Sequence, residues 1–130
     1  MINHQEPEFL LDENISPKIA KGFTAFGEKV DHLNEIIPKG TSDIKWIEQI
    51  GDEWILITND ISINKKPQEA RALLDAGLSV FFIDLTTQPT FWDWLVFFVN
   101  HWEEWKQLAI ETPRPFAYRI TKKGSPKKIF

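Results

Sequence analysis

The chain has 130 residues, of which 42% are hydrophobic and 26% charged; this composition predicts one folded unit and excludes an intrinsically disordered polar chain. It contains no cysteine, which excludes disulfide scaffolds, thiolate metal sites and cysteine nucleophiles, so any metal must be held by oxygen or imidazole. The N-terminal residues are acidic and lack the apolar length of a secretory signal, and a cytoplasmic location is expected.

Charge is divided unevenly along the chain. The net formal charge of −4 argues against a protein that binds nucleic acid non-specifically over its whole surface. Residues 113–130 contain six basic residues and no acid, whereas the preceding part has nine basic against nineteen acidic residues. The basic segment 113–130 is either a strip that contacts phosphate or a solvated end, and charge alone leaves both open.

Strand-like and helix-like patterns alternate over the first two thirds of the chain. Serine and proline mark helix starts, and glycine marks helix ends. The expected elements are a strand over 8–12, a helix from Ser16 and Pro17 to near Gly27, a strand over 29–33, a helix capped by Ser42, a strand over 53–58, a helix from Pro67 to Gly77, and a strand over 78–83.

A longer helix is expected over 91–109, since Thr90 and Asp93 have the spacing of a capping box, and a last strand is expected over 115–121. This alternation predicts right-handed βαβ units and a mainly parallel sheet with helices on both faces. The expected fold class is therefore α/β, a three-layer α/β/α sandwich.

The long helix carries two apolar stripes. One is expected to face the sheet and consists of Phe91, Trp94, Phe98, Trp102 and Trp105. The second consists of Trp92, Val96 and Val99. A homodimer or another protein partner through helix 91–108 would cover the second stripe, or the C-terminal strand and loops would bury it within the monomer.

Acidic residues follow the predicted strands at positions where they can converge. Parallel strands present their carboxyl ends at one edge, and ligands bind where consecutive connections diverge to opposite faces. If the first strand lies between the second and third, Asp12 lies beside Asp60. Asp43 opens a helix at the same edge, and Glu13 and Asn14 follow Asp12 directly.

Carboxylates gathered in one pocket repel one another, so they must share protons or hold a hard cation such as Mg²⁺ or Mn²⁺. Such an ion can acidify a bound water and neutralise a phosphodiester. The pattern thus favours metal-assisted phosphodiester hydrolysis. Each aspartate taken alone also fits a turn or a helix start, so the hypothesis depends on the strand order.

Four segments together resemble a known family: LLDENISPKIAKGF, Thr41-Ser42-Asp43, ILITNDISINKKPQEARALLDAGLSVFFI and PRPFAYRIT. In order and spacing they are similar to the PIN-like domains of short VapC-type toxins, in particular the VapC45-like subgroup. The resemblance implies a single PIN-like domain over 1–130 with a basic C-terminal segment over 113–130. It also implies an Mg²⁺- or Mn²⁺-dependent endoribonuclease, the toxin of a type II toxin–antitoxin pair, with RNA as substrate and a cognate antitoxin as partner.

The resemblance also assigns residues to roles. Its three catalytic acids and metal ligands match Asp12, Asp43 and Asp60, and Glu69 would complete the acidic cluster. The candidate substrate-binding residues are Asn14, Lys65, Lys66, Arg71 and Arg119. Many PIN domains have another acid shortly after the third-strand aspartate, where this chain has Ser62. Asp84, after the fourth strand, is a candidate substitute by its position and is not part of the resemblance.

Two other hypotheses stay open. Asp12 and Asp60 also resemble the acidic pocket of a response-regulator receiver, in which Asp60 accepts a phosphoryl group and Thr86 or Thr87 and Lys122 serve as the other site residues. The third hypothesis is a catalytically silent PIN-like module that binds a protein partner through the aromatic helix.

Overall fold

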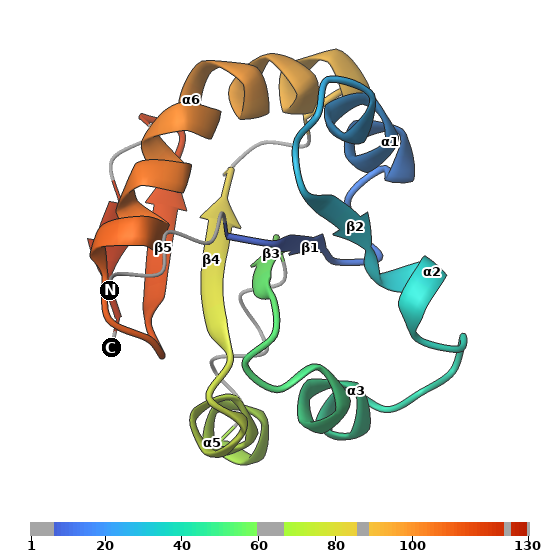
Figure 1. The fold of residues 1–130 in the computed structure, drawn as a ribbon, viewed down its shortest axis with the longest axis vertical. Helices are drawn as coiled ribbons and strands as arrows, with labels where there is room; N and C mark the ends of the chain where they lie inside the picture. Colours follow the sequence, from blue (N-terminus) through green and yellow to red (C-terminus); the bar gives the residue numbers. More distant parts are fainter. Residues whose placement is uncertain (1–6, 60–66, 86–88, 124–125, 130) are drawn as a thin grey trace.

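In the computed structural model, six strands form one sheet in the order β2-β1-β3-β4-β5-β6, with helices on both faces (Figure 1). The structure describes residues 7–59, 67–85, 89–123 and 126–129, without the side chains of 67–71. Strands β1 to β5 run parallel to their neighbours, and β6 pairs antiparallel with β5. The predicted α/β class with a mainly parallel sheet is confirmed.

The elements have the following bounds: β1 Phe9–Leu11, α1 Pro17–Ala25, β2 Val30–His32, α2 Leu33–Ile36, α3 Asp43–Ile50, β3 Ile55–Thr58, α5 Pro67–Ala76, β4 Ser79–Asp84, α6 Phe91–Glu111, β5 Ala117–Thr121 and β6 Pro126–Lys128.

Helix starts lie where the local signals predict them. The Ser16 side chain accepts a hydrogen bond from the Lys18 amide at 3.3 Å, with Pro17 as the first residue of α1. At the start of α6 the capping box is complete, because Thr90 Oγ1 accepts from the Asp93 amide at 3.1 Å and Asp93 Oδ2 accepts from the Thr90 amide at 2.9 Å. These side chains satisfy amides that the first turn leaves without partners.

Two short elements, α2 and β6, are absent from the sequence prediction. Helix α2 is a single turn directly after β2, and its N-cap is the imidazole of His32 rather than one of the usual capping residues. Strand β6 has a polar sequence without the apolar alternation of a buried strand, and it forms by pairing with the outer edge of β5. Its exposed lysines, Lys127 and Lys128, discourage further strand addition at this edge.

Alternation along the strands divides the core into two layers. Phe9 and Leu11 of β1 belong to a buried cluster with residues of α1 and α6, whereas Leu10 belongs to a second cluster with residues of α3. Figure 1 shows α1 and α6 on one side of the sheet and α3 and α5 on the other. Because both faces of the sheet are buried, the strand sequences are continuous apolar runs rather than alternating apolar and polar residues.

Helix α6 packs one side against the sheet and leaves the other exposed. Its fully buried positions include Phe98 and Trp105, as predicted, while Phe91 is 36% exposed, and Phe97 is buried instead. The assignment of Phe91 to the sheet-facing stripe is therefore wrong, and its ring instead packs edge-on against the exposed Trp92. The second stripe is exposed and consists of Trp92, Val96 and Val99. None of the helices in the described ranges is long and apolar enough to cross a membrane.

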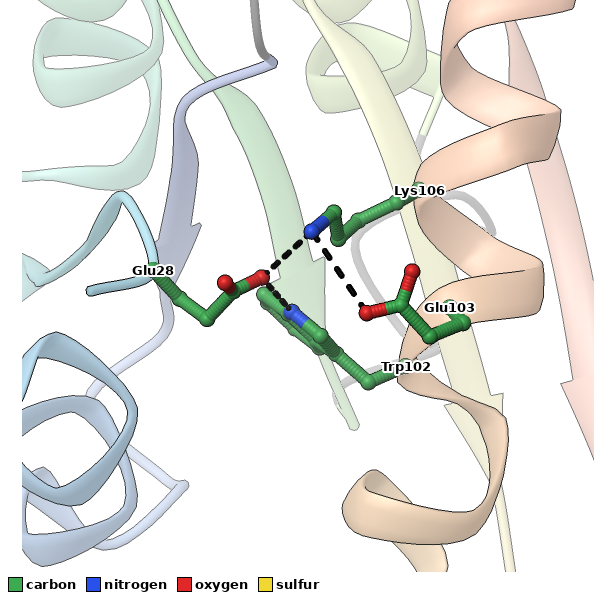
Figure 2. A network of polar contacts seen from close by, with 4 residues as sticks. All are labelled: Glu28, Trp102, Glu103 and Lys106. Carbon is green, nitrogen blue, oxygen red and sulfur yellow. Dashed lines mark hydrogen bonds and ion pairs between the residues drawn. The ribbon is translucent and has the colours of Figure 1, made fainter. Parts of the chain in front are cut away.

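A polar network fastens α6 to the connection between α1 and β2 (Figure 2). Glu28 Oε1 accepts hydrogen bonds from Lys106 Nζ and from Trp102 Nε1, each at 2.6 Å, and Lys106 Nζ also lies 3.6 Å from Glu103 Oε1. These contacts, with the Lys106 hydrogen bond foremost and the Trp102 bond next, lower the pKa of Glu28 below its ordinary value of 4.5. The network lies at the amino ends of the strands, away from the edge that carries the predicted acids.

Candidate functional site at the carboxyl edge of the sheet

Asp12 lies at the carboxyl edge of the sheet, directly after β1. Strand β1 lies between β2 and β3, which is the order on which the predicted convergence of acids depends. The Asp12 side chain is 4% exposed. Its Oδ2 accepts a hydrogen bond from Thr58 Oγ1 at 2.7 Å, and its Oδ1 accepts one from the Glu13 amide at 2.9 Å. A buried carboxylate with these donors is fixed in orientation.

The loop after Asp12 is held in place from β2. The Ile15 amide donates to the Asp12 carbonyl at 3.0 Å, which closes a tight turn. The fully buried His32 lies 2.7 Å from the Ile15 carbonyl through Nε2, and its Nδ1 accepts from the Asn34 amide at 3.2 Å. A carbonyl only accepts and an amide only donates, so the imidazole carries its proton on Nε2. This bracing role is not predictable from the sequence, since His32 lies in a strand far from Ile15 along the chain.

Asp43 is the first residue of α3, after the N-cap Ser42. It is partly buried, and its Oδ1 accepts a hydrogen bond from Trp46 Nε1 at 2.9 Å. A small hollow of about 20 Å³, roughly the room that one water needs, has both Glu13 and Trp46 among its lining residues. The loop after Asp12 and the first turns of α3 are therefore neighbours at this edge.

Asp12, Thr58 and the start of α3 share one side of the sheet. Asp12 and Thr58 each lie two residues beyond Leu10 and Leu56, which pack in the cluster with α3, and alternate residues of a strand point to the same face. The candidate site is thus on the α3 and α5 side of the carboxyl edge.

Several predicted site residues lie outside the described residues. This applies to Asp60, Lys65 and Lys66, and also to the side chains of Glu69 and Arg71. Helix α5 begins at Pro67, so these residues lie in the segment that joins β3 to α5 and in the first turns of that helix. Within the described part of the chain, no three His, Asp or Glu side chains form a group that could hold a metal ion.

Arg119 and Asp84 form an ion pair between β5 and β4. Arg119 Nε donates to Asp84 Oδ2 at 3.0 Å, and a second guanidinium nitrogen contacts the same oxygen. Asp84 therefore has a cation of this chain as its partner, which sequence reasoning did not predict. Arg119 is exposed and keeps guanidinium N–H groups for another ligand, and Asn14 is also exposed.

The donor chemistry at this edge fits a hard divalent cation. Asp12 supplies a buried and oriented carboxylate, and Asp43 supplies a second carboxylate on the neighbouring helix. Oxygen ligands of this kind suit Mg²⁺ and Mn²⁺. Thr58 and the Glu13 amide donate hydrogen bonds that orient the Asp12 carboxylate. Hydrogen bonds of this kind also orient the ligands of known metal sites.

Comparison with protein-family models matches residues 7–85 to the model described as a PIN-like domain. No curated protein and no solved structure shows a significant match to the chain. The matched residues comprise β1 to β4 and include Asp12, Asp43 and Asp60, whereas α6, β5 and β6 lie beyond them.

Proposed function

Because the chain belongs to the family of PIN-like domains, we propose that it is a metal-dependent endoribonuclease that hydrolyses RNA phosphodiesters. The observation that supports this most is the state of Asp12. It is a buried carboxylate at the point where the connections from β1 and β3 diverge, and it is held in orientation by Thr58. In parallel sheets, this point is where ligands bind.

In this proposal Asp12, Asp43 and Asp60 hold Mg²⁺ or Mn²⁺, with Glu69 as a further ligand. When bound, such an ion neutralises charge on the phosphodiester and acidifies a water. The chain's own residues position these ligands: Thr58 orients Asp12, and Trp46 holds the Asp43 carboxylate through its indole N–H.

The proposed RNA contacts come from two places. Lys65, Lys66 and Arg71 precede or open α5, which begins at the same edge and on the same side of the sheet as Asp12. Arg119 and Asn14 are exposed at this edge. Cationic side chains around a cluster of carboxylates allow an RNA backbone to approach acids that would otherwise repel it.

The finer assignment within this proposal is a VapC-type toxin of the VapC45-like subgroup, paired with an antitoxin. It is supported by the sequence resemblance, which runs from β1 to β5. Expressing the chain in bacteria should arrest growth, and a small neighbouring reading frame should relieve the arrest. Growth unaffected by expression of a folded, cleavage-competent chain would contradict the toxin assignment and leave the nuclease proposal standing.

The sheet order does not by itself separate a nuclease from a receiver, since receivers share the order 2-1-3-4-5. Lys122, however, lines a hollow with residues of α6, whereas Asp12 is on the α3 side of the sheet. This arrangement disfavours the joint role that a receiver requires of Lys122 and the acids. Incubation with acetyl phosphate and Mg²⁺ should leave the intact mass unchanged, and a phospho-adduct on Asp60 would favour the receiver.

Cleavage of a labelled single-stranded RNA tests the proposal. The wild type should cleave it with Mn²⁺ and lose cleavage in EDTA, and Asp60→Asn should lose cleavage while keeping the circular dichroism spectrum of the wild type. Asp52→Asn is the matched control, because Asp52 is exposed in the turn after α3 at the opposite edge. Undiminished cleavage by Asp60→Asn would remove Asp60 from the mechanism, and an inactive wild type would favour the catalytically silent hypothesis.

A further inference from the structure

A hollow of about 440 Å³ lies at the carboxyl edge of the sheet, on the α6 side. It is bounded by the first three turns of α6, by Leu85 after β4 and by Lys122 after β5. Its volume is within the range of small-ligand sites. None of its lining residues belongs to the loop after Asp12 or to α3, and it shares no lining residue with the small hollow beside Glu13 and Trp46.

The lining combines an aromatic platform with polar groups. Trp92 is 69% exposed, so one large aromatic surface is open to a ligand. The lining also includes the amide of Asn100 and the imidazole of His101. Asn100 is exposed and makes no hydrogen bond to any described residue, which leaves both its amide donors and its carbonyl free. An aromatic surface beside a free amide matches a nucleobase, which has a π-face and an edge of donors and acceptors.

Positive charge lies beside this hollow. Lys122 lines it, is exposed, and forms no ion pair within the described residues. Lys123 follows directly, and both precede β6 with its exposed Lys127 and Lys128. Asp93 also lines the hollow, but its carboxylate caps α6. The hollow is therefore flanked by the basic end of an otherwise acidic chain, and this charge complements a phosphate backbone.

The hollow and Asp12 open at the same edge of the sheet. Strands β3 and β4 separate β1 from β5, and neighbouring strands are about 4.8 Å apart, so the ends of β1 and β5 lie roughly 14 Å apart. The hollow is on the α6 side and Asp12 on the α3 side, so an RNA strand that reaches both has to cross this edge of the sheet in addition to the distance along it. We propose that the hollow lined by Trp92, Asn100 and Lys122 binds a nucleobase of single-stranded RNA, with a neighbouring phosphate on Lys122.

This inference rests on the proposed function and adds a second contact with the RNA: an unpaired base bound outside the cleavage site. Stacking on Trp92 accounts for affinity without strong sequence preference, because every base has a π-face. The experiment is fluorescence anisotropy with a short labelled single-stranded RNA in EDTA, where cleavage does not interfere.

Trp92→Ala should weaken RNA binding about tenfold. Phe26→Ala is the matched control, because Phe26 is an exposed aromatic residue (89%) at the opposite edge, after α1, and this variant should bind as the wild type does. Lys122→Ala should reduce the slope of log affinity against log salt concentration by about 0.7. Trp92→Ala should leave this slope unchanged, since stacking releases no counterions.

Equal RNA affinity of Trp92→Ala and the wild type would overturn the inference, and so would a wild type that binds no RNA. A Trp92→Ala variant that turns a dimer into a monomer in sedimentation, with unchanged RNA affinity, would assign the face to a second copy of the chain. Uridine or adenosine monophosphate binding as tightly as the RNA would assign the hollow to a free nucleotide. Cleavage separates the two proposals: a wild type that binds RNA through Trp92 without cleaving it contradicts only the nuclease.

Discussion

Thr58 donates a hydrogen bond of 2.7 Å to the carboxylate of Asp12, from the last residue of β3 to the first residue after β1. Register explains the contact, because Leu11 pairs with Ile57, and the next residues on the two strands are then adjacent and point to the same face. The bond holds the Asp12 carboxylate in one orientation at the carboxyl edge of the sheet, where Asp43 and Asp60 were also expected.

Replacing Thr58 with valine should leave the fold intact and impair the site. Valine keeps the β-branched shape that suits a strand but lacks the hydroxyl that orients Asp12. Loss of such an outer partner lowers metal affinity or activity by about 10- to 100-fold. Mn²⁺-dependent RNA cleavage measures this effect. Thr121→Val is the control, since Thr121 ends β5 at the same edge and its side chain makes no hydrogen bond to the described residues. Similar activity of both variants would contradict the role of Thr58.

His32→Ala should destabilise the protein by about 2–4 kcal/mol, because it leaves the Ile15 carbonyl without its donor and opens a cavity at a fully buried position. Urea unfolding followed by circular dichroism gives the free energy of unfolding. His32→Gln should lose less, since a glutamine amide can donate to the same carbonyl. Equal losses in the two variants would show that the hydrogen bond to the loop after Asp12 contributes nothing.

The Glu28 network predicts a pH-dependent contribution to stability. The pKa of Glu28 is lowered in the folded state, chiefly by the hydrogen bond from Lys106, so the contribution is present above the ordinary pKa of about 4.5 and is lost as the pH falls through the folded value. Glu28→Gln should therefore cost about 1–2 kcal/mol at pH 7 and little once Glu28 is protonated. Urea unfolding of the wild type and Glu28→Gln gives the free energy of unfolding of each, and the two are compared at pH 7 and at a pH below the folded pKa of Glu28.

Glu103→Gln is the control for this prediction, because Glu103 is 85% exposed although it lies 3.6 Å from Lys106. Exposed ion pairs of this kind contribute little. A stability difference between wild type and Glu28→Gln that stays constant as the pH falls would contradict the assignment to the Glu28 carboxylate. RNA cleavage by Glu28→Gln should match the wild type at neutral pH, since the network lies at the opposite edge from Asp12.

Local sequence patterns predict most of the elements, because caps, glycines and apolar runs act over a few residues. Ser16 with Pro17, and Thr90 with Asp93, begin helices as predicted. The location of Asp12 at the carboxyl edge of the sheet was also predictable, given alternating strands and helices, but its location at the switch point depended on the strand order. Strand order itself was an assumption, since no single segment encodes which strands become neighbours.

The remaining contacts depend on distant parts of the chain and were not predictable. Thr58 reaches Asp12 only through the register of β1 and β3. Asp84 was a candidate acid from its position after β4, but the neighbouring β5 brings Arg119 against it. Strand β6 was not predicted for a similar reason, since its polar residues form a strand only by pairing with β5.

Isothermal titration calorimetry with Mn²⁺ tests most directly whether the edge at Asp12 holds a divalent ion. The wild type should bind Mn²⁺, and Asp12→Asn should bind it at least about tenfold more weakly, because the amide is a neutral and poorer ligand. Circular dichroism of Asp12→Asn establishes that the variant is folded. Absence of Mn²⁺ binding by the wild type, or equal affinity in the two proteins, would contradict a metal-dependent nuclease site at Asp12.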